Sequence, residues 1–230
     1  MPRAGVDVLI GKATNLDLPL SEAATSNRVE YVRLLLDAGA NPGTRTLGTT
    51  PLENAIYSDS TQVVDVLAER GIVPRALWTY AACGRLDLVR PCFDSGGRLR
   101  PDAAAARPNP ADILVGFPPR IPAADDPEEI IAEAFVHACQ HGRTEVVRWF
   151  LDLGVSPDVA PYFGRAGMHW AIPYARLEVI RLLVERGADP SIRDELFQAD
   201  ADSWLRIFFA TRWHDPVTQQ LHHLIGSRTR

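Results

Sequence analysis

The chain has 230 residues, a formal net charge of −5 at pH 7 and a hydrophobic share of 46%. The acidic balance argues against a general binder of nucleic acid or of acidic membranes, because such proteins gather Lys and Arg on one face. The three cysteines are an odd number without metal-type spacing, which indicates a reducing compartment and no disulfide framework.

Targeting signals are not evident in the sequence. No apolar run approaches the roughly 18 to 20 residues that a membrane span needs. The N-terminus carries Arg3 and only one short apolar run, 8–10, so we do not expect a secretory signal. We therefore expect a cytoplasmic protein with no membrane partner and no nucleic-acid partner.

One helical pattern recurs along the chain. Each copy has apolar residues at helical spacing on one face and then a glycine, which is typical of a buried helix with a left-handed end. The copies lie at 29–42, 61–72, 86–97, 144–157 and 177–190, and their glycines are Gly39, Gly71, Gly96, Gly154 and Gly187. Two of the intervals between glycines are close to about 33 residues, one is shorter, and one contains a long insertion.

A second, shorter pattern precedes each of these helices. Its clearest copies are 18–24, 50–56 and 167–172, and degraded copies lie at 77–82 and 135–139. Pro51 suits the start of a helix, where its missing N–H would have no partner. Neither helix of a pair is long enough to be stable alone, so each pair must bury its apolar face against a neighbour.

These paired patterns resemble ankyrin repeat proteins, in a bacterial-type form with degenerate repeats and a Pro-rich insert. Thr50-Pro51-Leu52, Met168-His169-Trp170-Ala171 and the Gly-Ala-Asn/Asp-Pro ends at 39–42 and 187–190 carry the resemblance. It covers most of residues 18–195. It implies an all-α fold, an α-solenoid of stacked helix-turn-helix repeats with short hairpin fingers.

The predicted organisation is a single repeat domain over 1–230. It comprises an N-terminal cap (1–17), repeats one to three (18–97), a Pro-rich insert (98–127), repeats four and five (128–195) and a degenerate C-terminal capping repeat (196–230). Pro91 predicts a kink or an early end in the second helix of repeat three. In the capping repeat, Trp204-Leu205 and 217–224 are the expected helices, whereas the fold of 196–215 stays open.

The insert breaks the helical rhythm with seven prolines between Pro101 and Pro127. A Pro-rich and Ala-rich stretch of this kind indicates a loop or linker. Its apolar cluster at 113–117 either pins the loop against the repeats or belongs to a mobile flap that contacts a partner. The acidic residues from Asp125 onward predict a new helix over about 127–140, because acids favour the positive end of a helix dipole.

Several polar residues could be taken for a metal-binding or catalytic site, but we favour a structural role for them. His137 and His141 share a helix face at the spacing of zinc-binding helices, but the glutamate of that motif is missing. Cys139 reads as a small core residue. His214, His222 and His223 make an awkward metal site, because adjacent helical residues point about 100° apart.

We therefore predict no catalytic residue, no metal ligand and no cofactor. The resemblance implies that His169 bonds backbone between repeats. It also implies that a protein partner lies on the concave face, which fingers and first helices form. The residues carried over to that face are Leu47, Tyr57, Gln140, His141, Tyr162, Phe163, Arg165 and Tyr174. Tyr162, Phe163, Arg165 and Tyr174 form an aromatic-plus-Arg set, and interface hot spots are rich in such residues.

The expected function is a non-catalytic protein–protein interaction module that binds through its concave face. Two alternatives stay open. One is a structural or inhibitory subunit that docks through the Pro-rich insert. The other is an enzyme or metal-binding protein that uses the His-rich segments. Independently of these alternatives, Tyr162 and Phe163 could pack under the insert instead of contacting a partner. The partner and the oligomeric state do not follow from the sequence.

Overall fold

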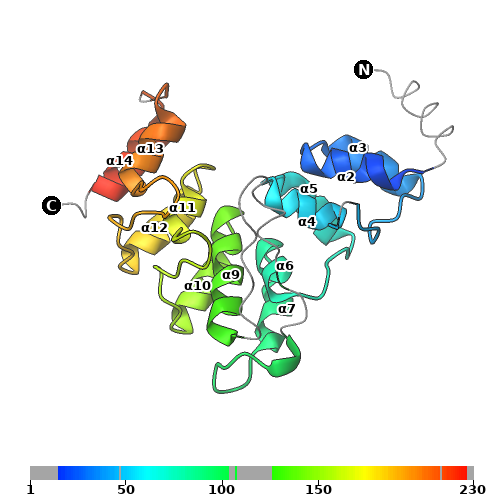
Figure 1. The fold of residues 1–230 in the computed structure, drawn as a ribbon, viewed down its shortest axis with the longest axis horizontal. Helices are drawn as coiled ribbons and strands as arrows, with labels where there is room; N and C mark the ends of the chain where they lie inside the picture. Colours follow the sequence, from blue (N-terminus) through cyan, green and yellow to red (C-terminus); the bar gives the residue numbers. More distant parts are fainter. Residues whose placement is uncertain (1–14, 47, 104–106, 108–125, 213, 227–230) are drawn as a thin grey trace. The chain divides into compact units, whose positions relative to one another are not determined.

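The computed structural model describes residues 15–46, 48–103, 107, 126–212 and 214–226. Within these ranges the regular elements are helices, and no strand is present. The helices follow one another in short pairs (Figure 1), as expected for an all-α solenoid. The Leu47 position that we predicted as a finger tip lies outside the described residues.

The described residues divide into two compact units, one ending at Val73 and the other beginning at Pro74. The first unit holds helices α2 (Asp17–Thr25), α3 (Val29–Asp37), α4 (Pro51–Tyr57) and α5 (Thr61–Glu69). Here α2 packs on α3 and α4 packs on α5, while α2 also contacts α4 and α3 contacts α5. Two repeats are therefore stacked in this unit. The prediction of one single domain is not tested by this division and stays a prediction.

The second unit continues the same plan in two layers. Its helices are α6 (Leu77–Ala82), α7 (Leu86–Val89), α9 (Pro127–Gln140), α10 (Thr144–Asp152), α11 (Gly167–Ala171), α12 (Leu177–Glu185), α13 (Ala201–Phe209) and α14 (Pro216–Gly226). The first helices α6, α9, α11 and α13 contact each other in that order. The second helices α7, α10, α12 and α14 form the other layer in the same order.

The core lies between these two layers. Phe135 of α9 and Phe150 of α10 are both fully buried, and their rings meet edge to face with centroids 6.3 Å apart. Ile180 and Leu183 of α12 are likewise inaccessible. Because each helix is so short, burial of these side chains supplies most of its stability.

Helix ends follow the predicted glycine signal in most repeats. Gly39 and Gly187 adopt φ of 93° and 86°, a left-handed conformation that glycine reaches without a steric penalty. In repeat three, however, α7 ends at Val89 and a 3-10 turn, Arg90–Cys92, follows. This confirms the early end predicted from Pro91, and the prediction that Gly96 ends this helix is wrong.

Side-chain hydrogen bonds tie repeats two, four and five to the repeat before them. The side chain of the residue just before a second helix donates to the last carbonyl of the preceding repeat's first helix. Ser60 donates to the carbonyl of Thr25 at 3.0 Å. Arg143 and Arg176 donate through Nε to the carbonyls of Ala82 and Gln140, each at 2.7 Å. These carbonyls have no partner inside their own helix, so the bonds satisfy groups that would otherwise be orphaned.

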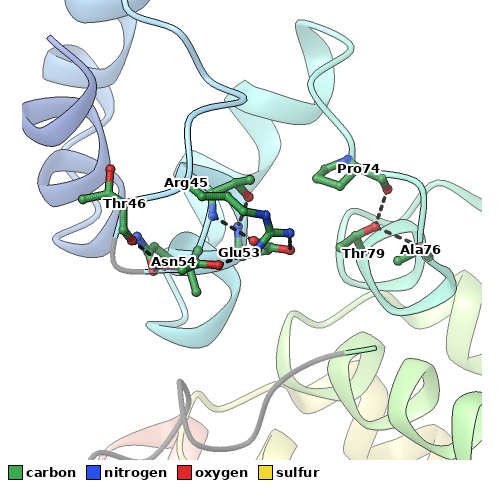
Figure 2. A network of polar contacts seen from close by, with 10 residues as sticks. Arg45, Thr46, Glu53, Asn54, Pro74, Ala76 and Thr79 are labelled. Atoms are coloured by element: carbon green, nitrogen blue, oxygen red, sulfur yellow. Dashed lines mark hydrogen bonds and ion pairs between the residues drawn. The ribbon is translucent and has the colours of Figure 1, made fainter. Parts of the chain in front are cut away.

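The finger of repeat two is held by its own polar network (Figure 2). Thr46 and Thr49 form an antiparallel bridge, and the Thr49 hydroxyl donates to Asn54 at 2.6 Å. Glu53 accepts from the backbone N–H of Thr50 at 2.8 Å, which completes a capping box at the start of α4. Arg45 pairs with the same Glu53 at 3.0 Å, so the finger is fixed to the helix that follows it.

A second polar group in Figure 2 belongs to the other unit. The Thr79 hydroxyl contacts the carbonyls of Pro74 and Ala76 at 2.7 and 2.9 Å. Thr79 is fully buried, so these contacts satisfy a hydroxyl that burial would otherwise leave unpaired.

The two helices expected in the C-terminal segment are present, while its role as a capping repeat stays a prediction. Trp204 and Leu205 lie on α13, and the expected second helix coincides with α14. The segment that we left open begins with a turn around Asp194, whose carboxylate accepts from the backbone N–H groups of Leu196 and Phe197 at 2.9 and 2.8 Å. Among the described helices, none combines the length and the apolar character needed to cross a membrane.

We expect two isoleucines to differ sharply in their effect on stability. Ile180 is 0% exposed, whereas Ile207 on α13 is 61% exposed. Ile180→Ala should lower the free energy of unfolding by about 2–5 kcal/mol through lost burial and an unfilled cavity. Ile207→Ala should change it by less than about 0.5 kcal/mol. Urea unfolding of both variants, followed by circular dichroism, measures the difference, and equal losses would contradict the layer assignment.

Candidate partner-binding site

The predicted partner-binding residues differ in how accessible they are. Tyr174 is 39% exposed, and Tyr57 and Phe163 are partly exposed. Four others are buried, with 2% exposure for Gln140 and His141, 1% for Tyr162 and 7% for Arg165. Their side chains are therefore covered, unlike the surface positions that we expected. The partner-binding role of the whole set stays a prediction.

The finger of repeat five is a tight turn that explains part of this burial. Tyr162 and Arg165 form an antiparallel bridge, with the Arg165 N–H donating to the Tyr162 carbonyl at 2.9 Å. Phe163 and Gly164 between them have φ of 53° and 67°. Positive φ at both central residues is the signature of a type I′ turn. Phe163 thus occupies the turn itself, while the flanking side chains reach back toward the helices.

Tyr162 lies against first-helix residues rather than at a free tip. Its ring centroid is 6.0 Å from that of His137 on α9 and 6.1 Å from that of Trp170 on α11. The ring therefore joins two consecutive first helices. The sequence reasoning missed this role because a finger position gives no indication of which way a side chain turns.

Arg107, from the Pro-rich insert, binds the acidic face of α9. Its guanidinium reaches Glu133 through Nε at 3.0 Å and through Nη2 at 2.6 Å, and Glu129 lies 3.4 Å away. The side chains of Arg107 and Glu133 are 12% and 3% exposed. This part of the insert is thus anchored on the repeats, whereas the apolar cluster at 113–117 lies outside the described residues.

Two opposing effects act on the pKa of Glu133 in this anchor. Burial raises the pKa of Glu133, and Arg107 acts in the opposite direction by stabilising the carboxylate. The bonds from Glu133 raise the pKa of Arg107, which stays protonated. The Glu133 carboxylate is therefore compensated only while Arg107 is present, because without that cation its negative charge would be buried and uncompensated.

His137 is a neutral core histidine. Burial lowers its pKa from the usual 6.5 to about 4, and only a bond between its Nδ1 and Gln140 at 3.2 Å opposes that shift. Its ring also lies 5.2 Å from Trp78. Cys139, two residues on, has a pKa raised by burial, so its thiol stays protonated. Both side chains serve as packing groups in this structure.

His169 joins two repeats through backbone bonds, as the resemblance implied. Its Nδ1 accepts from the Ala166 N–H at 3.2 Å, and its Nε2 lies 3.2 Å from the Ala199 carbonyl. The acceptor role at Nδ1 places the proton on Nε2, which then donates to Ala199. Burial lowers the pKa of His169 and keeps the ring neutral. The prediction of a structural bonding role is confirmed.

The remaining histidines do not gather into one site. His222 lies 3.9 Å from Asp202, whereas His223 lines a surface hollow between α12 and α14 together with Arg181. His214 is exposed. In the part of the chain that the structure describes, no group of three or more His, Cys, Asp or Glu side chains is placed to hold a metal ion.

Arg165 rests in a box of aromatic rings. Its guanidinium carbon lies 4.6 Å from the ring centre of Trp204, 5.5 Å from Phe197 and 5.9 Å from Trp170. Burial lowers the pKa of Arg165, and the charge of Asp194 acts against that shift. Phe197 and Trp204 were absent from the predicted site, because the repeat signal fades where they occur. The Trp at 204, seven residues after a Phe, is the one cue in the sequence.

Loss of the Arg107 side chain should lower the stability of the folded protein. Arg107→Ala leaves the buried Glu133 carboxylate unpaired, so we expect the free energy of unfolding to fall by about 3 kcal/mol. The double variant Arg107→Ala, Glu133→Gln should lose clearly less than Arg107→Ala alone.

The matched control is Arg98→Ala. It breaks the pair with Asp94, whose side chains are 85% and 35% exposed, and should cost less than about 1 kcal/mol. Urea unfolding at pH 7 compares the three variants. Similar small losses for Arg107→Ala and Arg98→Ala would show that the insert is not anchored here.

His137 should make the fold acid-sensitive. Its pKa is lowered from 6.5 to about 4 on folding, so between these values the unfolded chain binds more protons than the folded one. The stability is therefore complete above pH 6.5 and falls as the pH drops, with this group contributing up to about 1.4 kcal/mol per pH unit. In His137→Gln the fall in unfolding free energy between pH 6.5 and 4.5 should be shallower. Parallel slopes for the two proteins would contradict the assignment.

Comparison with known proteins places this architecture in a family. The family model described as Ankyrin repeats (3 copies) matches residues 3–78 and 111–194, which is more than half of the chain. A curated relative, the ankyrin repeat-containing protein P1E11.10 of Schizosaccharomyces pombe, is 41% identical over 58 residues. That match spans 25% of this chain and 28% of the relative, so the chain covers only about a quarter of that protein. Because the family model covers both sides of the insert, the chain belongs to the ankyrin repeat family.

Proposed function

We propose that the protein is a non-catalytic module that binds a protein partner through the face formed by its fingers and first helices. Ankyrin repeats generally mediate protein–protein interaction. The observation that supports it is the presence, in each unit by itself, of accessible aromatic side chains at finger or first-helix ends: Tyr57 in the first unit, and Phe163 and Tyr174 in the second. Aromatic residues on a rigid scaffold provide binding energy at a low entropy cost.

Each of these residues sits on a fixed part of the backbone. Tyr57 is the last residue of α4, directly before the turn into α5. Tyr174 precedes α12, and the guanidinium carbon of Arg176 lies 5.6 Å from the centre of its ring. Phe163 is held in the finger turn, where its carbonyl accepts from the Glu195 N–H at 2.7 Å. The buried residues Gln140, His141 and Tyr162 support this face from beneath in our proposal.

We propose no enzymatic activity, in keeping with the typically non-catalytic character of the family. A cytoplasmic location is proposed with it, and the burial of all three free cysteines is compatible with a reducing compartment. The insert-docking alternative is kept as an outcome of the test below, because the anchored Arg107 supports a structural role for at least one part of the insert.

The test is affinity capture from native lysate, with bound proteins identified by mass spectrometry. The site variant carries Tyr57→Ala, Phe163→Asn and Tyr174→Ala, where Asn tolerates the positive φ at position 163. We expect it to retain at least about tenfold less of a specific partner than the unchanged protein does.

The matched control carries Tyr31→Ala and Arg148→Ala on the second helices α3 and α10, and it should retain the partner fully. Circular dichroism first establishes that all three proteins fold alike. Equal retention by the site variant would refute binding through this face and direct attention to the insert.

A further inference from the structure

Arg165 holds a buried positive charge that forms no ion pair with any residue the structure describes. The side chain is 7% exposed, and its Nε is buried without a hydrogen-bond partner. Among the residues that the structure describes, no hydrogen bond or ion pair involves the Arg165 guanidinium. A guanidinium carries five N–H donors, and leaving such donors unmet in a desolvated place is costly. This arrangement calls for an acceptor from outside.

The nearest acidic group is already committed to other donors. Asp194 is fully buried, and its carboxylate accepts from the N–H groups of Leu196, Phe197 and Ala199 at 2.9, 2.8 and 3.2 Å. It also accepts from Trp204 Nε1 at 2.9 Å. Asp194 therefore favours the charge of Arg165 from a distance but makes no ion pair with it. By contrast, Arg45 of the repeat-two finger is paired with Glu53, and Arg107 of the insert is paired with Glu133.

The rings around Arg165 fix its position before any ligand arrives. A guanidinium stacked on aromatic faces is oriented by cation–π attraction, with Trp204 closest at 4.6 Å. A fixed planar guanidinium matches a carboxylate, which accepts two parallel N–H bonds. Because the side chain is already ordered, little conformational entropy remains to be lost on binding.

Apolar surface adjoins this cation. Phe197 is 61% exposed and Phe208 is 48% exposed, and the ring of Phe208 stacks on Trp204 with centroids 5.3 Å apart. Ile207, next to Phe208, is 61% exposed as well. A ligand that satisfies Arg165 would therefore meet exposed rings beside it, and an apolar side chain next to its carboxylate would be buried on contact.

We propose that Arg165 is the anchor for an Asp or Glu side chain of the protein partner, with an apolar residue of that partner seated on Phe197 and Phe208. This proposal rests on the partner-binding function proposed above and names the chemistry that the partner brings. The carboxylate accepts from the unused N–H donors of Arg165, and the rings exclude water from the contact.

The test follows the Nε–H resonance of Arg165 by NMR in the intact chain. The probe is the peptide acetyl-Gly-Leu-Glu-Phe-Gly-amide, compared with the same peptide carrying Gln in place of Glu. We expect a saturable shift of the Arg165 signal with the Glu peptide and affinity for the Gln peptide lower by about tenfold or more, because a charged acceptor is lost. Arg107 is the internal control, since it is already paired and its signal should not move.

Arg165→Lys supplies a second control, read in both proteins at the indole N–H of the adjacent Trp204, because the variant has no Arg165 signal. It keeps the charge but loses the planar fork, and it should weaken binding of the Glu peptide by about tenfold. Equal shifts with both peptides, or none with either, would overturn the proposal. A response to inorganic phosphate without a response to the Glu peptide would overturn the carboxylate assignment. A shift on concentrating the protein alone would assign the site to a second copy of this chain.

The outcome separates this proposal from the function on which it rests. If the variant at Tyr57, Phe163 and Tyr174 loses its partner while the Arg165 signal does not respond to the Glu peptide, binding through this face is supported. The proposal of an acidic anchor is then refuted. If the partner is retained by that variant and Arg165 still responds to the peptide, the anchor stands at a different face. Failure of both experiments removes both proposals.

Discussion

The stacking of the repeats depends on backbone carbonyl groups at the C-terminal end of a first helix, which have no hydrogen-bond partner inside that helix. A helix of five to nine residues, such as α11 or α2, satisfies few of its own backbone groups, so its last carbonyl needs a donor from elsewhere. Ser60, Arg143 and Arg176 provide that donor from the next repeat. In these three pairs a repeat is thus completed by its neighbour, in addition to the burial of apolar faces. Repeats of this kind gain their stability from nearest-neighbour interfaces.

Arginines from two fingers and from the insert contact the helices behind them. Arg45 binds Glu53, Arg107 binds Glu129 and Glu133, and Arg165 stacks on aromatic rings. Arg45 and Arg107 each pair with a carboxylate, which offsets the cost of desolvation. The pair also holds the finger or the insert on the helix behind it. Arg165 uses ring faces and leaves its N–H donors unused. That difference, rather than exposure alone, distinguishes a supporting arginine from one available to a ligand.

Much of the fold could be predicted from the spacing of residue types in the sequence, but little of the candidate site could. Most glycine ends and Pro91 are local signals, so most helix ends were predicted correctly, and the His169 bonds were expected from the family resemblance. The pairing of Arg107 with Glu133 spans an insert without period, so no spacing rule connects them. Burial of Tyr162 depends on the turn at Phe163, and a phenylalanine at positive φ is not expected from its intrinsic preference. The box around Arg165 draws its rings from the segment where the repeat pattern fades.

The place of the insert has a consequence for how the chain tolerates change in length. It enters between the second helix of one repeat and the first helix of the next, where a finger would otherwise stand, while α6 and α9 still pack together. The contacts that set the stacking register lie in the helices, so the connector is free to grow. Each doubling of a flexible loop adds only about 0.6 kcal/mol of closure entropy. Finger positions are thus the natural points at which a foreign loop can be grafted into this scaffold.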